Sequence, residues 1–306
     1  MACSRFLTLA TLLVVIVSAR PVSAADPVRL THDGRMKFTP VFINRGEDLV
    51  YVDLLNPKMF RLQNLQVSDG EIKPVHETVG SQEFDPAYSA DGKYYAYAKA
   101  VGTLSVGLVI TSRVDKKEVN LAPGQGFSGY RSPAIAPDSS RVLFSFAEEG
   151  RQDIFSVNME GKDRKALTGG KGINLWPDFS ASGQQIAFCS SRDGNFEIYV
   201  MKPDGSEITR VTNNPFQDLR PRFSPDGKRL AFASHRDGNF EIYLINTDGS
   251  GLRRITDHEE RDDYPAWSPD GKSLVIVSER EGEHDLYRVE VPPYEASKAD
   301  ATTPNP

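Results

Sequence analysis

Apolar and polar residues alternate along most of this chain with a period of two, which is typical of β-strands. The alternation is clearest where two apolar side chains stand two residues apart, nine and eleven residues after a proline. These pairs are Leu49/Tyr51, Tyr95/Tyr97, Val142/Phe144, Ile186/Phe188, Leu230/Phe232 and Leu274/Ile276. No segment beyond residue 25 has the 3.6-residue period of a helix, so the pattern predicts an all-β protein.

The prolines that precede these pairs mark an internal repeat. They are Pro40, Pro86, Pro133, Pro177, Pro221 and Pro265, at intervals of 46, 47, 44, 44 and 44 residues. Within each unit, turns such as Asp226-Gly227 and Asp237-Gly238 separate four short apolar segments. Four-stranded antiparallel units of about 40–50 residues are typical of a β-propeller, so the repeat predicts six four-stranded blades.

The first and last units indicate how the ring closes. Thr31 precedes its proline by nine residues, as Thr212 and Thr256 do, although Arg29-Leu30-Thr31 has no first three strands of its own. The sixth unit ends after its third strand, at 286–291. We therefore expect the N-terminal strand to complete the last blade, which protects both edges from aggregation.

The two ends of the sequence differ from the repeats. The segment Phe6–Ser18 is apolar and uncharged, and small residues follow it up to Ala25, as in a secretory signal peptide. Thirteen residues are too short to cross a bilayer as a helix, so no membrane span is expected. We predict a signal peptide at 1–25, the propeller at 26–294 and a disordered tail at 295–306, in a periplasmic or secreted protein.

Charge and cysteine content restrict the function further. The formal net charge is −6, and loss of Arg5 and Arg20 with the signal peptide makes it more negative. Such a chain is not expected to bind nucleic acid by neutralising phosphates. Only Cys189 remains after residue 25, so no intramolecular disulfide is expected, and its apolar surroundings indicate a buried packing residue.

The amino-acid sequences of the later repeats resemble those of a known family. The segments FSPDGK (223–228), ASHRDGNFEIY (233–243) and NTDGS (246–250) are similar to the TolB-type propeller repeat. By spacing, the resemblance extends from Asp26 to about Tyr294. TolB carries an α/β domain ahead of its propeller, whereas few residues precede the first repeat here, so the resemblance covers the propeller only. It implies an exported propeller whose mouth binds a protein or peptide of the cell envelope.

No catalytic constellation is found in the sequence. Asp153, Glu197, Glu241 and Asp285 recur at one position of successive repeats, so we interpret them as parts of the scaffold that bond the local hairpin or a nearby arginine. The five histidines form no pair at metal-ligand spacing, and no G-x-S-x-G elbow or phosphate loop is present. We predict no catalytic residue, no metal and no cofactor.

Non-repeated residues point to a binding rim instead. In a propeller of this strand order, the loops before strand one and between strands two and three share one rim, where a charged sector faces an aromatic one. The predicted partner-binding residues are Asp257, His258, Glu259, Glu260, Arg261, Asp262, Asp263, His235, Arg236, Glu279, Arg280, Trp176 and Tyr130.

Two function classes remain open from the sequence. The first is a monomeric binding module for an envelope protein or peptide, with a polysaccharide as a further candidate partner. The second is a carbohydrate-active enzyme, an oligosaccharide lyase or hydrolase, with its site in the channel. Whether the chain is an enzyme is therefore left undecided at this stage, and a plain solvated rim is an alternative to the binding rim.

Overall fold

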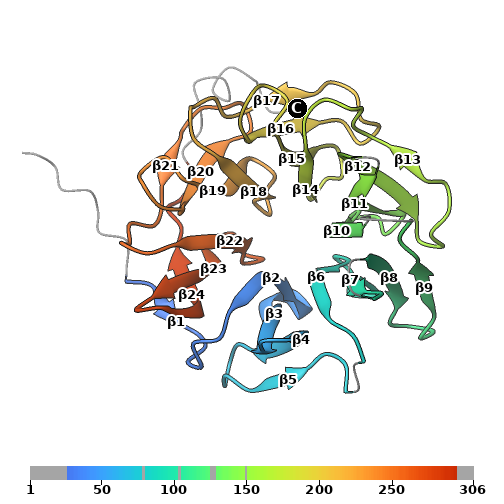
Figure 1. Cartoon of the computed structure of the whole chain (residues 1–306). Helices are drawn as coiled ribbons and strands as arrows, with labels where there is room; N and C mark the ends of the chain where they lie inside the picture. The colour runs from blue at the N-terminus through green and yellow to red at the C-terminus, as the bar shows by residue number, and fades with distance from the viewer. Residues whose placement is uncertain (1–25, 78–79, 103–104, 125–128, 149, 295–306) are drawn as a thin grey trace, which may run out of the picture.

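The computed structural model describes residues 26–77, 80–102, 105–124, 129–148 and 150–294, so the predicted signal peptide and tail lie outside the described residues. Within these ranges, all regular elements are β-strands except one short 3₁₀ turn, η1 (Asn44–Gly46), which confirms the all-β prediction. The strands form sheets arranged around a central axis as a propeller (Figure 1).

Four separate sheets have four strands each. The first contains β2 (Lys37–Ile43), β3 (Asp48–Asn56), β4 (Met59–Gln66) and β5 (Ile72–Pro74). The next two contain β14 (Asn174–Phe179), β15 (Ile186–Ser190), β16 (Glu197–Met201) and β17 (Thr209–Arg210), then β18 (Asp218–Phe223), β19 (Arg229–Ser234), β20 (Glu241–Asn246) and β21 (Arg253–Arg254). The last contains β22 (Asp262–Trp267), β23 (Ser273–Arg280), β24 (Glu283–Glu290) and β1 (Val28–Arg29).

The prediction of six separate four-stranded blades is wrong. Four such blades are present, while the second and third repeats share one eight-stranded sheet. Its strands are β6 (Glu83–Tyr88), β7 (Tyr94–Ala100), β8 (Val106–Ser112), β9 (Glu118–Leu121), β10 (Gly129–Ile135), β11 (Arg141–Glu148), β12 (Arg151–Asn158) and β13 (Lys165–Ala166).

One close contact joins the two halves of the eight-stranded sheet. β8 and β10 pair in parallel at Val106 and Gly129. A Cβ atom on Gly129 would lie 3.2 Å from the Cβ of Val106, so the absence of a side chain lets the two backbones approach. Repeat spacing does not report this contact, because it depends on a single glycine at the start of β10.

The predicted closure of the ring is confirmed. β1 pairs with β24 in antiparallel register, with Val28 opposite Arg288 and Arg29 opposite Tyr287, as the outer strand of the last blade. Figure 1 shows β1 at the periphery beside β24. The alternating apolar side chains pack between neighbouring sheets, as where Phe188 and Tyr199 of β15 and β16 meet Leu143 and Ile154 of β11 and β12.

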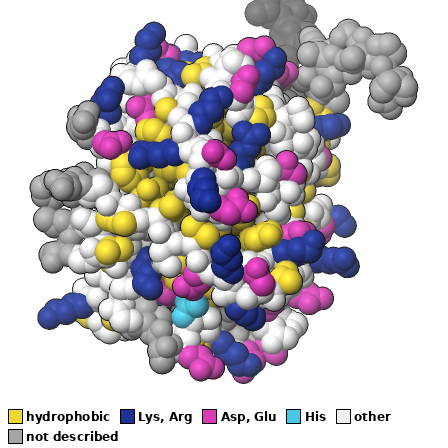
Figure 2. Space-filling model, turned by 90° about the vertical axis from the view of Figure 1, so that its right-hand side faces the viewer, with side chains coloured by type: hydrophobic (Ala, Val, Ile, Leu, Met, Phe, Trp, Pro, Cys, Tyr) yellow, Lys and Arg dark blue, Asp and Glu magenta, His cyan; other side chains and the backbone are white. Residues whose placement is uncertain are grey.

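The first strand of each repeat lies nearest the axis, and the short fourth strands lie at the periphery (Figure 1). The inner strands are β2, β6, β10, β14, β18 and β22. On the outer wall, acidic, basic and apolar side chains are interspersed, as Figure 2 shows for one side. That side presents no continuous basic surface. Among the described residues, no helix is long and apolar enough to cross a membrane.

Candidate binding site in the central channel

Every inner strand carries a β-bulge at its repeat proline. The strand register shifts there, and the residue before the proline has a positive φ, between 45° and 55°. These residues are Thr39, Asp85, Ser132, Trp176, Arg220 and Tyr264. A left-handed conformation costs a residue with a side chain roughly 1–2 kcal/mol, so the surrounding structure must hold it. A bulge can re-aim a side chain, and four of these six line a cavity on the axis.

Arg220 is one of the residues that line this cavity. Its guanidinium lies 4.5 Å from the ring centre of Trp176 and 4.2 Å from that of Tyr264, so it is stacked between the two rings. It also contacts Asp263 at 3.0 Å and donates a hydrogen bond to the Tyr264 hydroxyl at 3.2 Å. Burial alone would lower the pKa of Arg220, but attraction to Asp263 raises it, so the side chain stays charged.

Two further arginine–aspartate pairs line the channel. Arg131 of β10 donates to Asp85 of β6 at 2.7 Å, and Arg222 of β18 donates to Asp178 of β14 at 3.2 Å. Burial would raise the pKa of Asp85, but Arg131 and a backbone donor outweigh this and lower it. For Asp178, burial dominates and raises the pKa. Each pair ties two inner strands together.

Two wider spaces lie beyond the small central cavity of about 10 Å³. Arg220 also lines a pocket of about 220 Å³ at one mouth, which we call the β22 pocket. Arg222 also lines a depression of about 310 Å³ with Asp178, Phe223 and Trp267. Arg220 and Arg222 thus both reach the central cavity, which is too small for anything larger than about one water molecule.

The β22 pocket draws residues from three sequence-distant parts of the ring. Its lining residues are Met36, Lys37, Phe38, Arg220, Arg261, Asp263, Tyr264, Val277, Glu279 and His284. Phe38 meets Tyr264 edge-on, with ring centres 5.6 Å apart, and forms an aromatic wall. Arg261 pairs with Asp263, and Glu279 lies 3.5 Å from His284. The pocket therefore offers apolar contacts together with charges of both signs.

Comparison with known proteins agrees with this architecture. The sequence matches the TolB beta propeller domain over residues 64–219 and 213–303. The chain belongs to that family. No curated protein matches it significantly in sequence.

Solved structures with the same fold share little sequence with this propeller. A protein assigned as TolB from Agrobacterium tumefaciens has a TM-score of 0.67 and 21% identity, covering 86% of this chain and 93% of that one. TolB from Acinetobacter baumannii has a TM-score of 0.63 and 20% identity, covering 81% and 65%. Oligogalacturonate lyase from Vibrio parahaemolyticus has a TM-score of 0.57 and 12% identity, covering 86% and 93%. These likenesses establish the fold alone.

The TolB-like propeller brings only part of the predicted rim into the β22 pocket. Arg261, Asp263 and Glu279 line it, and Trp176 stacks on Arg220 at its base. The two loop types do share a rim, because Asn239 donates to the carbonyls of His258 and Glu260 at 2.8 Å.

Other predicted rim residues lie elsewhere. Tyr130 is buried between Phe144 and Phe146, which corrects its placement on an exposed aromatic sector. Asp262 and Asp263 belong to β22 and are buried, so they are not loop charges open to a partner. His235 packs edge-on against Phe240.

The remaining rim side chains are engaged locally. Arg236 stacks over Tyr243 and binds Asp218 at 2.9 Å, and Arg280 stacks over Tyr287. The backbone of His258 donates to Glu241 at 2.9 Å, and Asp257 pairs with Arg254 at 2.7 Å. Asp257 and Glu259 are exposed, whereas Glu260 is half-buried.

The repeated acids belong to the scaffold, as predicted. Thr212 donates to Glu197 at 2.5 Å, and its hydroxyl oxygen accepts a bond from the Ile198 amide at 2.9 Å. Arg210 completes the unit by binding Glu197 at 2.8 Å. The same threonine–acid contact recurs at Asp153, Glu241 and Asp285. These carboxylates are engaged by the scaffold, and two of them also bind a neighbouring sheet: Asp285 lies 3.2 Å from Lys37 of β2, and Asp153 accepts a bond from Asn174 of β14 at 3.0 Å.

Several residues that line the channel are absent from the sequence-based predictions. Arg220, Tyr264, Asp85, Arg131, Asp178 and Arg222 were not singled out, although a signal was available. The proline repeats in all six units, but the residue before it differs in each one. The backbone position is fixed and strained in every repeat, but the side chain placed there is not. Such variation at a strained position indicates a functional site rather than a part of the scaffold.

Metal-binding chemistry has no candidate in the described part of the chain. Within it, no group of three or more His, Cys, Asp or Glu side chains could hold a metal ion. Cys189 is buried in the core between the sheets of β15 and β19, and burial raises the pKa of its thiol well above the usual range. The thiolate needed for nucleophilic attack is therefore disfavoured at neutral pH.

Proposed function

We propose that this chain is an exported TolB-like propeller that binds a protein or peptide of the cell envelope through the β22 pocket. The observation that carries the proposal is the composition of this pocket at a channel mouth. An aromatic wall formed by Phe38 and Tyr264 lies beside Arg261, Glu279 and His284. Apolar contacts flanked by charges of both signs suit the binding of a peptide. The small number of polar groups in this concave site would fix the orientation of the bound peptide.

The size of the pocket favours a small part of a larger partner. About 220 Å³ is below the roughly 300–1,000 Å³ of pockets that bury a whole drug-sized ligand. We therefore expect one or two side chains to enter, while the surrounding rim contacts the rest of the partner. Export is supported by the apolar segment Phe6–Ser18, and we propose a periplasmic or secreted location on that basis.

A substitution at the mouth of the pocket tests this proposal. Met36 lines the pocket and is 41% exposed, so Met36→Asp adds a charge to the apolar part with little effect on folding. Envelope proteins from the source organism that crosslink to the mature chain should be retained at least about tenfold less well by the variant. Val114→Asp is the matched control, because Val114 is 72% exposed and lies outside the pocket. Equal retention by both variants would contradict the proposal.

A carbohydrate-active enzyme is the second candidate function. It is favoured by the fold shared with oligogalacturonate lyase. Incubation of the purified protein with oligogalacturonate, followed by absorbance of the unsaturated product, separates the two functions. Elemental analysis for a stoichiometric transition metal adds an independent readout. Product formation together with bound metal would favour the enzyme over the binding module.

A further inference from the structure

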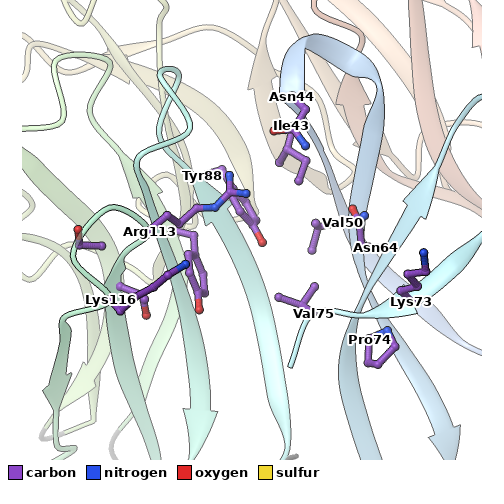
Figure 3. A pocket seen from close by; sticks show the side chains of 13 residues that line it. Ile43, Asn44, Val50, Asn64, Lys73, Pro74, Val75, Tyr88, Arg113 and Lys116 are labelled. Atoms are coloured by element: carbon purple, nitrogen blue, oxygen red, sulfur yellow. The ribbon is translucent and has the colours of Figure 1, made fainter. Parts of the chain in front are cut away.

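A second concave site lies away from the channel, between the first blade and the β6–β9 half of the eight-stranded sheet. We call it the interblade groove. It encloses about 400 Å³ and is larger than the β22 pocket. Figure 3 shows Tyr88, Arg113 and Lys116 on one side of it, and Asn64, Lys73 and Val75 on the other.

The charge of the interblade groove is opposite to that of the whole chain. Its lining contains Lys73, Arg113 and Lys116 but no aspartate or glutamate, whereas the chain has a formal net charge of −6. Lys73 pairs with Glu71 at 2.7 Å, outside the lining. Arg113 donates a hydrogen bond to the carbonyl of Gly92 at 3.0 Å, which holds its side chain in place. Because a carbonyl is neutral, this contact does not compensate the charge of Arg113. Such a concentration of positive charge in a concavity attracts anions.

One tyrosine in the groove, Tyr95, is held by a partly buried network. The Nδ1 atom of His76 lies 2.6 Å from the carboxylate of Glu83, and its Nε2 atom lies 3.0 Å from the hydroxyl of Tyr95. Glu83 is almost fully buried and also accepts a bond from the Leu62 amide at 3.2 Å. The Tyr95 side chain is therefore fixed before any ligand arrives, which reduces the entropy cost of binding.

The groove also provides a flat face and a hydrogen-bond acceptor. Tyr88 and Tyr95 stack with ring centres 5.4 Å apart and planes 18° apart. Asn64 donates from Nδ2 to Asp48 at 3.4 Å, so its Oδ1 atom is directed elsewhere, and that oxygen is buried without a partner. A ligand hydroxyl satisfies it after a small shift of the Asn64 side chain, and this bond removes the cost of a buried acceptor without a partner.

We propose that the interblade groove binds a small hydroxylated anion, that is, a sugar ring carrying a carboxylate or a phosphate. Arg113 and Lys116 contact the anionic group, the tyrosine pair supports the ring, and Asn64 accepts a bond from a hydroxyl. A volume of about 400 Å³ falls within the usual range for small-molecule sites. This site is separate from the channel and does not depend on the function proposed for the β22 pocket.

Titration calorimetry with four probes tests this inference on the full mature chain. The probes are glucuronate, glucose 6-phosphate, glucose and inorganic phosphate. We expect one or both of the sugar anions to bind, and glucose and inorganic phosphate to bind at least about tenfold more weakly. Tighter binding of glucuronate would identify a carboxylate as the preferred anionic group, and tighter binding of glucose 6-phosphate would identify a phosphate. Failure of both sugar anions to bind, or equally tight binding of glucose or of inorganic phosphate alone, overturns the proposal.

Variants locate the binding. The double substitution Arg113→Gln with Lys116→Gln removes two charges from exposed side chains and should weaken binding at least about tenfold, with a smaller dependence on salt. The matched control is Lys162→Gln with Lys272→Gln, two exposed lysines outside the groove. An equal loss in the control would show that only net charge matters and would refute a site in the groove. Tyr95→Phe keeps the stacked ring and should weaken binding less.

Discussion

At the scale of single residues, the side chain three residues before the repeat proline has different partners in different blades. Asn174, Asp218 and Asp262 each stand three residues before a repeat proline. Asn174 binds Arg192 at 3.0 Å, and Asp218 binds Arg236 at 2.9 Å. Asp262 is buried, and both of its carboxylate oxygens have no well-formed hydrogen bond. Burial raises its pKa to about 6, and nearby Glu241 adds to the effect while Ser278 and Arg280 oppose it.

This difference gives a prediction for Asp262→Asn. A carboxyl group whose pKa is higher in the folded state binds protons more tightly there, so folding is favoured at low pH and penalised as the pH rises through about 6. A shift of about two units corresponds to at most about 3 kcal/mol. We expect the variant to be more stable than the parent at pH 7, with the gain disappearing below about pH 4. Urea unfolding of the parent and the variant between about pH 4 and pH 7 measures this difference in stability.

Asp218→Asn is the matched control for that experiment. Asp218 has two hydrogen bonds from Arg236, so the amide loses a charge-assisted contact there. We expect this variant to gain less than Asp262→Asn at pH 7 or to lose stability. An identical response of the two variants would show that the unpaired state of Asp262 has no energetic effect.

At the scale of elements, the closing strand β1 is held by more than its two register pairs. Thr31 follows it, donates to Asp285 at 2.5 Å and accepts a bond from the Leu286 amide at 3.0 Å. Leu30 packs against the core between β3 and β23. The same threonine–acid unit joins the third and fourth strands in the third, fourth and fifth repeats. The closure thus uses the ordinary bonding of a blade, although its strands are distant in sequence.

Deleting residues 26–31 should therefore destabilise the whole ring. The deletion removes the partly buried Leu30 from the core, at a cost of at most roughly 1.5–3 kcal/mol, and leaves the buried Asp285 with fewer partners. We expect a lower melting temperature and faster aggregation from the exposed edge of β24. Thr31→Val should lose about 1–3 kcal/mol by itself, and Thr31→Ser should lose less because it keeps the hydroxyl. A truncated protein that melts like the parent contradicts this account.

The junction between β8 and β10 is a second element-scale feature. Gly129→Val would place a side chain against Val106, where even a Cβ atom is only 3.2 Å away. We expect the two halves of the eight-stranded sheet to separate locally, at a cost of about 1–3 kcal/mol. Amide exchange at 106 and 129 should accelerate. Gly169→Val is the control, because a Cβ atom there meets nothing within 4 Å.

Features encoded by spacing along the chain could be predicted from the sequence, whereas contacts between residues that are distant in sequence could not. The strands, the turns and the partner of β1 follow from repeated residues such as Thr31 and Thr212, because local spacing encodes them. The merging of two repeats depends on Gly129, and the pairing of Arg220 with Trp176 and Tyr264 depends on side chains that converge across the axis. Spacing along the chain carries no information on such convergence, so the interior of the channel was not predicted.

At the scale of the whole molecule, the binding proposal predicts an effect only from the exposed positions of the acidic loop before β22. Neutralising Asp263 would remove the partner of Arg220 and Arg261, so its effect on binding could not be separated from stability. Asp257→Asn with Glu259→Gln avoids this problem, because both side chains are exposed. We expect slower association with a partner captured at the β22 pocket and a nearly unchanged melting temperature.

Asp204 and Asp248 supply the control for that experiment. Both lie in turns that lead into the outer strands β17 and β21, where each accepts a bond from a nearby serine amide at 2.9 Å. Asp204→Asn with Asp248→Asn removes the same number of charges and should leave the association rate unchanged. If the control slows association and the Asp257/Glu259 pair does not, the partner binds at another surface.

The pairing of β1 with β24 also has a topological consequence. Because the first and last described strands are neighbours in one sheet, the ring has no unique starting point. A circular permutant could join the two ends by a short linker and open the chain elsewhere. The loop 213–217 between β17 and β18 is suitable, since new ends there would fall between two complete blades and divide neither. In such a permutant the former closing strand becomes covalently continuous with its sheet.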